Sequence, residues 1–217
     1  GTAYTFTVVA TNAVGNGATS SASTAVTPAT IPGAPTNVTA IAGNTQATVS
    51  WSAPVSTGGS LITGYTVTAS PGGQTVTVGG STLTATFTAL ANGTAYTFTV
   101  VATNTAGAGA SSSASNVVTP ATVPGASTNV TAIGGNAQAT VSWAAPSSTG
   151  GVETTEYRVT ASPGGATVTV GGTTLMATVT GLSNGTSYTF VVVATNAVGD
   201  GASSSASNAV TPATVAG

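Results

Sequence analysis

Cysteine and histidine are absent from this chain of 217 residues, and charged residues make up 2% of it. Without cysteine there are no disulfides and no thiol nucleophiles, and without either residue there is no zinc site of the usual kind and no imidazole base. One Lys or Arg stands against three Asp or Glu. Because binding to phosphates needs several cations, we expect no nucleic-acid partner.

Long hydrophobic runs are also missing, although 41% of the residues are hydrophobic. Most of these are Ala and Val, and Thr, Ser or Gly interrupts every apolar segment. A membrane helix needs roughly 18 consecutive apolar residues, so no membrane span is expected. No signal peptide follows Gly1, and we expect the chain to be a piece of a longer protein.

What the sequence does contain is an internal repeat of 92 residues. Gly1, Gly93 and Gly185 stand in equivalent places, and Trp51 and Trp143 keep the same spacing. A repeat of this length corresponds to one small domain per copy.

The best-preserved part of the repeat is residues 90–104. Apolar side chains alternate with Thr and Val from Tyr96 to Thr103, which is typical of a β-strand with one face on a core. Asn92 and Gly93 supply a turn just before it. The other segments are equally short and alternating, with no helical periodicity, which indicates a β-sandwich.

The order Asn-Gly-Thr-x-Tyr, then a strand ending Val-x-Ala-x-Asn, then Gly-x-Gly resembles strand F of a fibronectin type III domain. A Val-x-Trp-x-x-Pro segment around Trp51 supports the resemblance. It implies an all-β chain of tandem fibronectin type III, immunoglobulin-like antiparallel sandwiches. In that family a tyrosine hydroxyl returns to the backbone upstream, a place that Tyr96 and Tyr188 would take, with Tyr4 as a third copy.

On this pattern we expect three parts. Residues 1–28 would be a partial domain with strands F and G only, and residues 32–120 and 124–212 would each be a complete domain. Proline-bearing linkers between them predict semi-rigid joints. Within residues 1–28 we expect one strand over Tyr4–Val8, and in the first complete domain a turn at Gly107–Gly109 and strand G over Ser112–Val118.

Two groups of side chains are singled out structurally. We expect a buried core formed by the repeated aromatic residues Trp51, Trp143, Tyr65, Tyr157, Tyr96, Tyr188, Phe98 and Phe190. The alternating residues of the partial domain could complete a sandwich belonging to a neighbouring subunit by strand addition: Tyr4, Phe6 and Val8. An arbitrary cut in a continuous array is the competing interpretation.

All charged side chains lie in the last repeat: Glu153, Glu156, Arg158 and Asp200. An odd separation along a strand sends Glu153 and Glu156 to opposite faces, which does not suit a glycosidase pair. Glu156 and Arg158 share a face, and we expect them to form an exposed ion pair.

No catalytic, cofactor or metal site is predicted. The many serines and threonines lack a histidine or lysine to activate them, and Asp200 alone cannot hold calcium. The Gly-x-Gly turns contain no Arg-Gly-Asp triplet, so integrin binding is not implied. The N-glycosylation pattern is matched at Asn37, Asn92, Asn129 and Asn184. In a threonine-rich chain this pattern often occurs by chance.

The nearly uncharged surface is the most informative feature for function. Soluble β-proteins protect sheet edges with lysine and other charges, and net charge keeps them apart. We therefore expect self-association, in a structural segment of a long extracellular, cell-surface fibre, sheath or adhesin stalk. The alternative is an accessory spacer or weak carbohydrate-binding module of a secreted polysaccharide-degrading enzyme, in contact with polysaccharide; a virion tail decoration also stays open.

Overall fold

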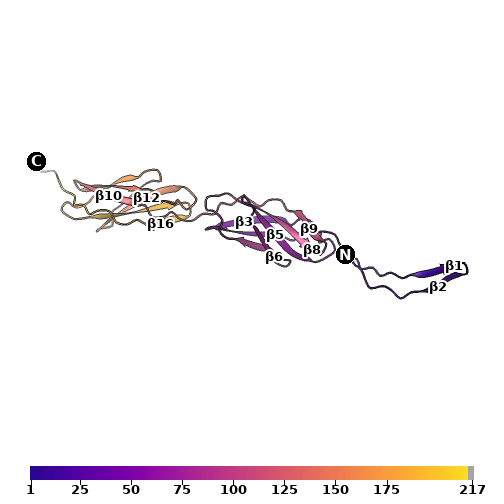
Figure 1. Ribbon diagram of the computed structural model, residues 1–217. Helices are drawn as coiled ribbons and strands as arrows, with labels where there is room; N and C mark the ends of the chain where they lie inside the picture. The colour runs from indigo at the N-terminus through magenta and orange to yellow at the C-terminus, as the bar shows by residue number, and fades with distance from the viewer. Residues whose placement is uncertain (215–217) are drawn as a thin grey trace. The chain divides into compact units, whose positions relative to one another are not determined.

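The computed structural model describes residues 1–214, and every regular element in that range is a β-strand (Figure 1). The prediction of an all-β chain is therefore confirmed. Within these residues no helix is long and apolar enough to cross a membrane.

The first complete repeat has two sheets. One has the strand order β3-β4-β7 and the other the order β6-β5-β8-β9, so β3, β7, β6 and β9 are the edges. The strands are β3 (Thr36–Gly43), β4 (Gln46–Ser52), β5 (Ile62–Ser70), β6 (Thr75–Gly79), β7 (Thr84–Phe87), β8 (Thr97–Asn104) and β9 (Gly107–Ser111).

The second complete repeat has the same two sheets, with orders β10-β11-β14 and β13-β12-β15-β16. Its strands are β10 (Thr128–Gly135), β11 (Gln138–Ala144), β12 (Thr154–Ser162), β13 (Thr167–Gly171), β14 (Met176–Thr180), β15 (Thr189–Asn196) and β16 (Gly199–Ser203). The registers also repeat: Tyr65 faces Ala102 as Tyr157 faces Ala194.

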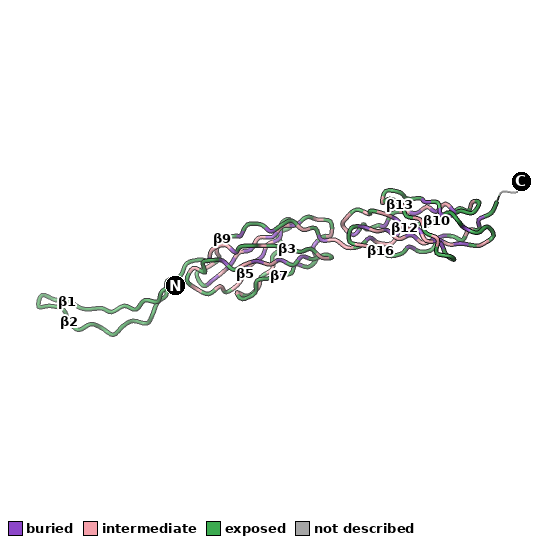
Figure 2. The backbone as a smooth tube through the Cα atoms, turned by 180° about the vertical axis from the view of Figure 1, so that it is seen from behind, coloured by how far each residue is buried: buried purple, intermediate pink, exposed green. Residues whose placement is uncertain are grey.

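The core of each repeat lies between its two sheets. Alternate residues of β8 are buried along its whole length, as the period of two along a strand requires. The rings of Trp51 and Tyr65 lie 5.3 Å apart and join the two sheets, and those of Phe87 and Phe98 lie 4.9 Å apart. Figure 2 shows the buried residues as purple segments inside each repeat.

Residues 1–28 form a hairpin whose strands are β1 (Val9–Asn12) and β2 (Gly15–Thr19). The expected strand over Tyr4–Val8 is not regular; its Tyr4 forms an isolated bridge with Val26. In a complete repeat this stretch belongs to a strand because β5 pairs with β8, and the described hairpin has no such neighbour. Its tube is green, the colour of exposed residues, throughout (Figure 2).

The Gly-x-Gly segment is not a turn. Gly107–Gly109 begin β9, and the turn is formed by the two residues before them. A Cβ on Gly109 would collide with the carbonyl oxygen of Pro32, so this close approach of the preceding linker requires glycine. The expected strand over Ser112–Val118 also differs: β9 ends at Ser111 and the pairing resumes as a single bridge at Val118.

Candidate functional site

Two buried serines explain why β9 ends where it does. Ser112 Oγ accepts a hydrogen bond from the Val100 N–H at 2.9 Å, and Ser115 Oγ accepts one from the Phe98 N–H at 3.1 Å. Each hydroxyl also donates to a backbone carbonyl next to it, at 2.8 and 2.7 Å. Ser204 and Ser207 repeat the arrangement. These hydroxyls take the place of backbone carbonyls as acceptors, while the Ser112 and Ser115 N–H groups still donate to the Val100 and Phe98 carbonyls at 2.9 Å. No pattern in the sequence indicated this role.

An asparagine side chain after the last strand of each repeat forms hydrogen bonds with the edge strand of the other sheet. Asn116 exchanges two hydrogen bonds with the backbone of Ala40 in edge strand β3, and Asn208 does so with Ala132 in β10. A side-chain amide has one donor group and one acceptor, so it can satisfy both backbone groups of a single residue.

In each repeat another asparagine, Asn104 or Asn196, binds the linker that precedes the repeat. Asn104 is buried, and its Nδ2 donates to the carbonyls of Thr30 and Thr57 at 2.7 and 2.8 Å. Its Oδ1 accepts from the N–H groups of Ala106 and Gly107 at 2.8 and 3.2 Å. Asn196 makes the same four contacts in the second repeat. The Thr30 N–H in turn donates to the Gly58 carbonyl at 2.8 Å. Both backbone groups of Thr30, its N–H and its carbonyl, are therefore hydrogen-bonded, and they fix the linker in place.

The predicted core residues lie between the sheets of the two repeats. Trp51 and Trp143 are each 5% exposed, and their indole Nε1 groups have no hydrogen-bond partner. The other six are 8% exposed or less: Tyr65, Tyr157, Tyr96, Tyr188, Phe98 and Phe190. Burial raises the pKa of Tyr65 above its ordinary value. The Tyr188 hydroxyl accepts a hydrogen bond from the Ser183 N–H, five residues upstream, at 3.1 Å.

The charged residues do not pair as expected. Arg158 Nη2 lies 2.8 Å from Asp200 Oδ2, so the predicted Glu156–Arg158 pair is wrong. Neighbouring strands place Arg158 of β12 within reach of β16, through the register Arg158–Val193 and Val193–Ser203. A hydrogen bond from Thr195 Oγ1, at 2.7 Å, and then the Arg158 guanidinium lower the pKa of Asp200. Sequence reasoning missed the pair because it joins two strands rather than two positions on one.

Glu153 and Glu156 offer no catalytic arrangement. Glu153 lies just before β12 and is exposed, whereas Glu156 lies within that strand and is partly exposed. A hollow of about 290 Å³ is lined by Glu153 together with Thr, Ala, Gly and Tyr157, and no second carboxylate reaches it. Among residues 1–214, no group of three or more His, Cys, Asp or Glu could hold a metal ion.

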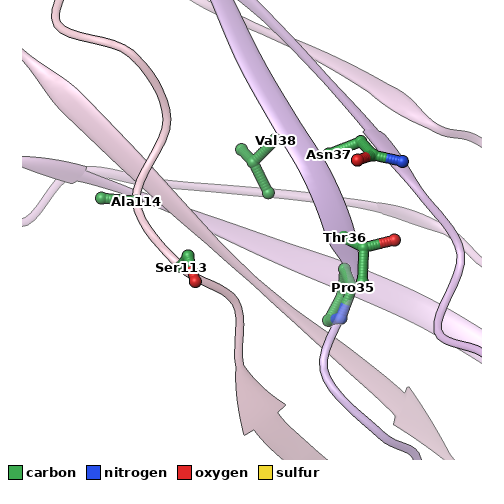
Figure 3. Close-up of a pocket in the computed structure, with 6 residues that line it drawn as sticks. All are labelled: Pro35, Thr36, Asn37, Val38, Ser113 and Ala114. Carbon is green, nitrogen blue, oxygen red and sulfur yellow. The ribbon is translucent and has the colours of Figure 1, made fainter.

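Each repeat has a shallow groove beside its first strand. In the first repeat it measures about 280 Å³ and is lined by Pro35, Thr36, Asn37, Val38, Ser113 and Ala114. Figure 3 shows β3 residues on one side and Ser113 and Ala114 on the other. The second groove, of about 390 Å³, includes Ser127, whose buried Oγ has no hydrogen-bond partner and which stands in the place of Pro35. Neither groove contains an ionisable side chain, so each can offer a ligand hydroxyls, amides and small apolar groups.

Three of the glycosylation-pattern asparagines form side-chain hydrogen bonds, and the first is Asn37, whose Nδ2 donates to Ser52 Oγ at 3.3 Å. Asn92 Oδ1 accepts from the Thr45 N–H and its Nδ2 donates to Asn44 Oδ1, both at 2.8 Å. Asn184 has the corresponding bonds to Ala137 and Asn136. A glycan on Asn92 or Asn184 would leave its Nδ2 with a single N–H for this bond, and glycosylation stays a prediction.

The suggested strand donors lie at the surface of the hairpin. Tyr4, Phe6 and Val8 are 52%, 61% and 70% exposed. The structure describes no strand covering them.

A family model of the fibronectin type III domain matches residues 33–118 and 123–210. Chitinase A1 of Niallia circulans is 38% identical over 205 residues, which cover 86% of this chain and 27% of that protein. Exoglucanase B of Cellulomonas fimi is 34% identical over 228 residues, covering 98% of this chain and 20% of that protein. The chain thus spans 20–27% of the length of these curated relatives.

Among solved structures, the FN1–FN3 domains of chicken CNTN1 are similar at 25% identity and a TM-score of 0.39. The match covers 97% of this chain and 75% of that one. Family match, strand order and burial pattern agree, and the chain belongs to the fibronectin type III family.

Proposed function

We propose that this chain is a non-catalytic, extracellular spacer in a polysaccharide-degrading enzyme. The observation that carries the proposal is the similarity to chitinase A1 and exoglucanase B, which takes in most of this chain but about a quarter or less of those proteins. The two names give different activities. A region that resembles both enzymes does not account for the difference between their activities. Such a region suits a structural spacer that both enzymes use.

The chemistry of the two complete repeats supports a spacer. The buried hydroxyls of Ser112, Ser115, Ser204 and Ser207 are hydrogen-bonded to backbone groups, and the single Arg is paired with Asp200. Nucleophilic catalysis needs a base beside the hydroxyl, and residues 1–152 carry no ionisable base.

The burial of the aromatic side chains argues for a spacer over a carbohydrate-binding module. Among residues 1–214 the exposed aromatic side chains are Tyr4 and Phe6, both in the hairpin. Aromatic faces supply large apolar contact area, and the complete repeats keep theirs between the sheets. We therefore expect little binding of the complete repeats to chitin or cellulose.

A graft tests the proposal. The matched region of chitinase A1 is replaced by this chain, by a Gly-Ser linker of equal length, or by nothing. We expect the graft to keep the hydrolysis rate on insoluble chitin, the deletion to lower it, and all three to cleave a soluble oligosaccharide equally. A graft that performs like the deletion would overturn the spacer role.

Depletion experiments distinguish a pure spacer from a weak carbohydrate-binding module. The chain is mixed with insoluble chitin or cellulose, and the protein left in solution is measured. If the polysaccharide removes no more of this chain from solution than of an unrelated fibronectin type III protein, the result supports a pure spacer. Saturable binding would instead identify a carbohydrate-binding module.

A structural fibre or cell-surface stalk is the second candidate, favoured by the formal net charge of −2 and the absence of lysine at the sheet edges. Association driven by uncharged surfaces should persist at high salt, because screening removes only charge–charge terms. Sedimentation velocity over a hundredfold concentration range checks this. Particles that grow with concentration, equally at low and high salt, support the fibre; a monomer throughout would exclude it.

A further inference from the structure

The sheet edges of the first repeat differ in how well they are protected against pairing with another chain. In β3, Asn116 occupies both backbone groups of Ala40. At β9, the carbonyl oxygen of Pro32 lies so close to Gly109 that a Cβ would not fit between them. Strand β7 has four residues, the fewest in this repeat. Occupied backbone groups, a covering segment and a short strand all hinder edge pairing. Within residues 1–214, edge strand β6 has no comparable protection.

The hydrogen bonds of β6 show which of its backbone groups point outward. The Ala69 N–H donates to the Gln74 carbonyl at 2.8 Å, just before the first register pair of β5 and β6. Bonded and non-bonded pairs alternate along an antiparallel ladder. Val76 and Val78 therefore bond to β5, and the N–H and carbonyl of Thr77 point away from it. Among the described strands, β5 is the one partner of β6.

The outward edge of β6 is complementary to itself. In an antiparallel pair of two β6 strands centred on Thr77, each Thr77 would exchange both backbone hydrogen bonds with its counterpart. Thr75 would face Gly79 of the second copy. Val76 would face Val78, with Cβ atoms about 4.5–5.5 Å apart. Both valines are partly exposed in the single chain, so this pairing would bury apolar surface. A two-fold axis through the strand centre closes the pair.

Charge does not oppose this contact. Residues 1–152 carry no charged side chain. Strand β13 repeats the Thr-Val-Thr-Val-Gly sequence of β6, and its Thr169 faces Arg158 of β12. In a pair of β13 strands centred on Thr169, the two Arg158 residues would be three strand spacings apart, about 14 Å, which exceeds the screening length of about 8 Å at physiological salt. Asp200, on the far side of β12 from β13, also holds each Arg158 side chain.

We propose that β6 and β13 are pairing edges for a second copy of this chain. The two copies join strand to strand, in the antiparallel register centred on Thr77 or on Thr169. The inference goes beyond the spacer role and does not rest on it.

Cysteine cross-linking of the full chain tests the register, because the sequence has no cysteine of its own. One variant combines Thr77→Cys with Thr169→Cys. Facing Cα atoms of a bonded pair lie about 5.5 Å apart, a distance that a disulfide spans. Mild oxidation should therefore link most of the chains to one another.

The matched control for cross-linking combines Thr75→Cys with Thr167→Cys on the same strands. Two Thr75 residues would lie on opposite sides of the centre, about 14 Å apart along the strands, which is too far for a disulfide. We expect at least tenfold less linked product than from the central variant. Equal linking of the two variants would overturn the register, and a lack of linked product from both would overturn the pairing.

Like charges at the centre should separate the copies. Thr77 and Thr169 are exposed, and Thr77→Lys combined with Thr169→Lys would place lysine directly opposite lysine. In sedimentation velocity at physiological salt, we expect the dissociation constant to rise about tenfold or more. Mixing this variant with the variant that carries Thr77→Glu and Thr169→Glu should restore association.

The matched control for the charge variants combines Thr68→Lys with Thr160→Lys. These residues lie in β5 and β12, one strand away from the pairing edge, and add the same charge. We expect an unchanged dissociation constant.

Two outcomes of sedimentation would count against the proposal in different ways. If association survived the central lysine variant, another surface would join the copies, and the assignment to β6 and β13 would be wrong while the fibre candidate would stand. If the unaltered chain were monomeric at every concentration, both would be wrong. The graft into chitinase A1 reports on the spacer role independently of either outcome.

Discussion

Asn116 forms two hydrogen bonds with a single residue, Ala40, although 76 positions separate them. Its Oδ1 accepts from the Ala40 N–H at 2.9 Å and its Nδ2 donates to the Ala40 carbonyl at 3.0 Å. Ala40 lies in edge strand β3, whose outward backbone groups would otherwise be free to pair with another chain. An uncharged side chain thus protects the edge at a point where other β-proteins use lysine.

Replacing Asn116 by Ala should destabilise the first repeat by about 1–3 kcal/mol, because it leaves the buried backbone groups of Ala40 without partners. Asn116→Asp keeps the shape but, when ionised, has no donor for the carbonyl. We expect both variants to lower the denaturant midpoint of one transition and to leave that of the second repeat unchanged. Ser113→Ala, at an exposed position, is the control. An unchanged midpoint for Asn116→Ala would show that the two bonds add nothing to stability.

Asn104 should control the order of the preceding linker. Asn104→Ala removes two bonds to carbonyls and two bonds to turn N–H groups. We expect faster cleavage by thermolysin at Ile31 and a loss of about 1–3 kcal/mol from the first repeat. Mass spectrometry of the first fragments checks the site of cleavage.

Asn12 offers the matched control for that variant, because it is the equivalent residue of the hairpin. Its Oδ1 accepts from Val14 and Gly15 at 2.9 and 3.2 Å, within its own turn. Asn12→Ala should therefore leave cleavage at Ile31 unchanged. Equal acceleration by both variants would mean that Asn104 does not fix the linker.

The sequence could predict the sandwich, because alternation in residues 96–103 and the repeat are local signals. It could not predict the asparagine and serine contacts, since each joins groups brought together by the fold. Nothing in the sequence links Asn116 with Ala40, because the two residues meet only where the chain leaves the sheet ladder after Ser111. The Arg158–Asp200 pair was missed for the same reason, because reasoning along one strand favoured Glu156.

The acid stability of the two repeats should differ. Thr195 and Arg158 lower the pKa of Asp200 from its ordinary value of 3.8. A carboxyl whose pKa is depressed by folding stabilises the folded state above the unfolded pKa, and this contribution is lost as pH falls through the folded pKa. Stability of the second repeat should therefore decrease below about pH 4, modestly, because both side chains are exposed to solvent.

The first repeat is the internal control for that pH dependence, because residues 1–152 carry no charged side chain. Its unfolding midpoint should stay constant over the same acid range. In the second repeat, Thr195→Val should raise the pKa of Asp200, since the hydrogen bond from Thr195 is the largest cause of its depression. Titration of the Asp200 carboxyl by NMR measures this. An unshifted pKa in Thr195→Val would contradict the assignment to that hydrogen bond.

Trp51 combines extensive packing with an unsatisfied donor, so its truncations should separate the two effects. Its ring lies 5.3 Å from Tyr65, and its Nε1 is buried without a partner. Trp51→Ala leaves a cavity and should cost about 3–5 kcal/mol. Trp51→Phe keeps an aromatic ring and removes the unpaired N–H, whose burial is itself unfavourable, so it should cost much less. Chemical denaturation followed by far-UV circular dichroism measures both, while Trp143 fluorescence reports the unaltered second repeat. Equal losses in the two variants would show that the indole's second ring, and not the aromatic contact with Tyr65, holds the sheets together.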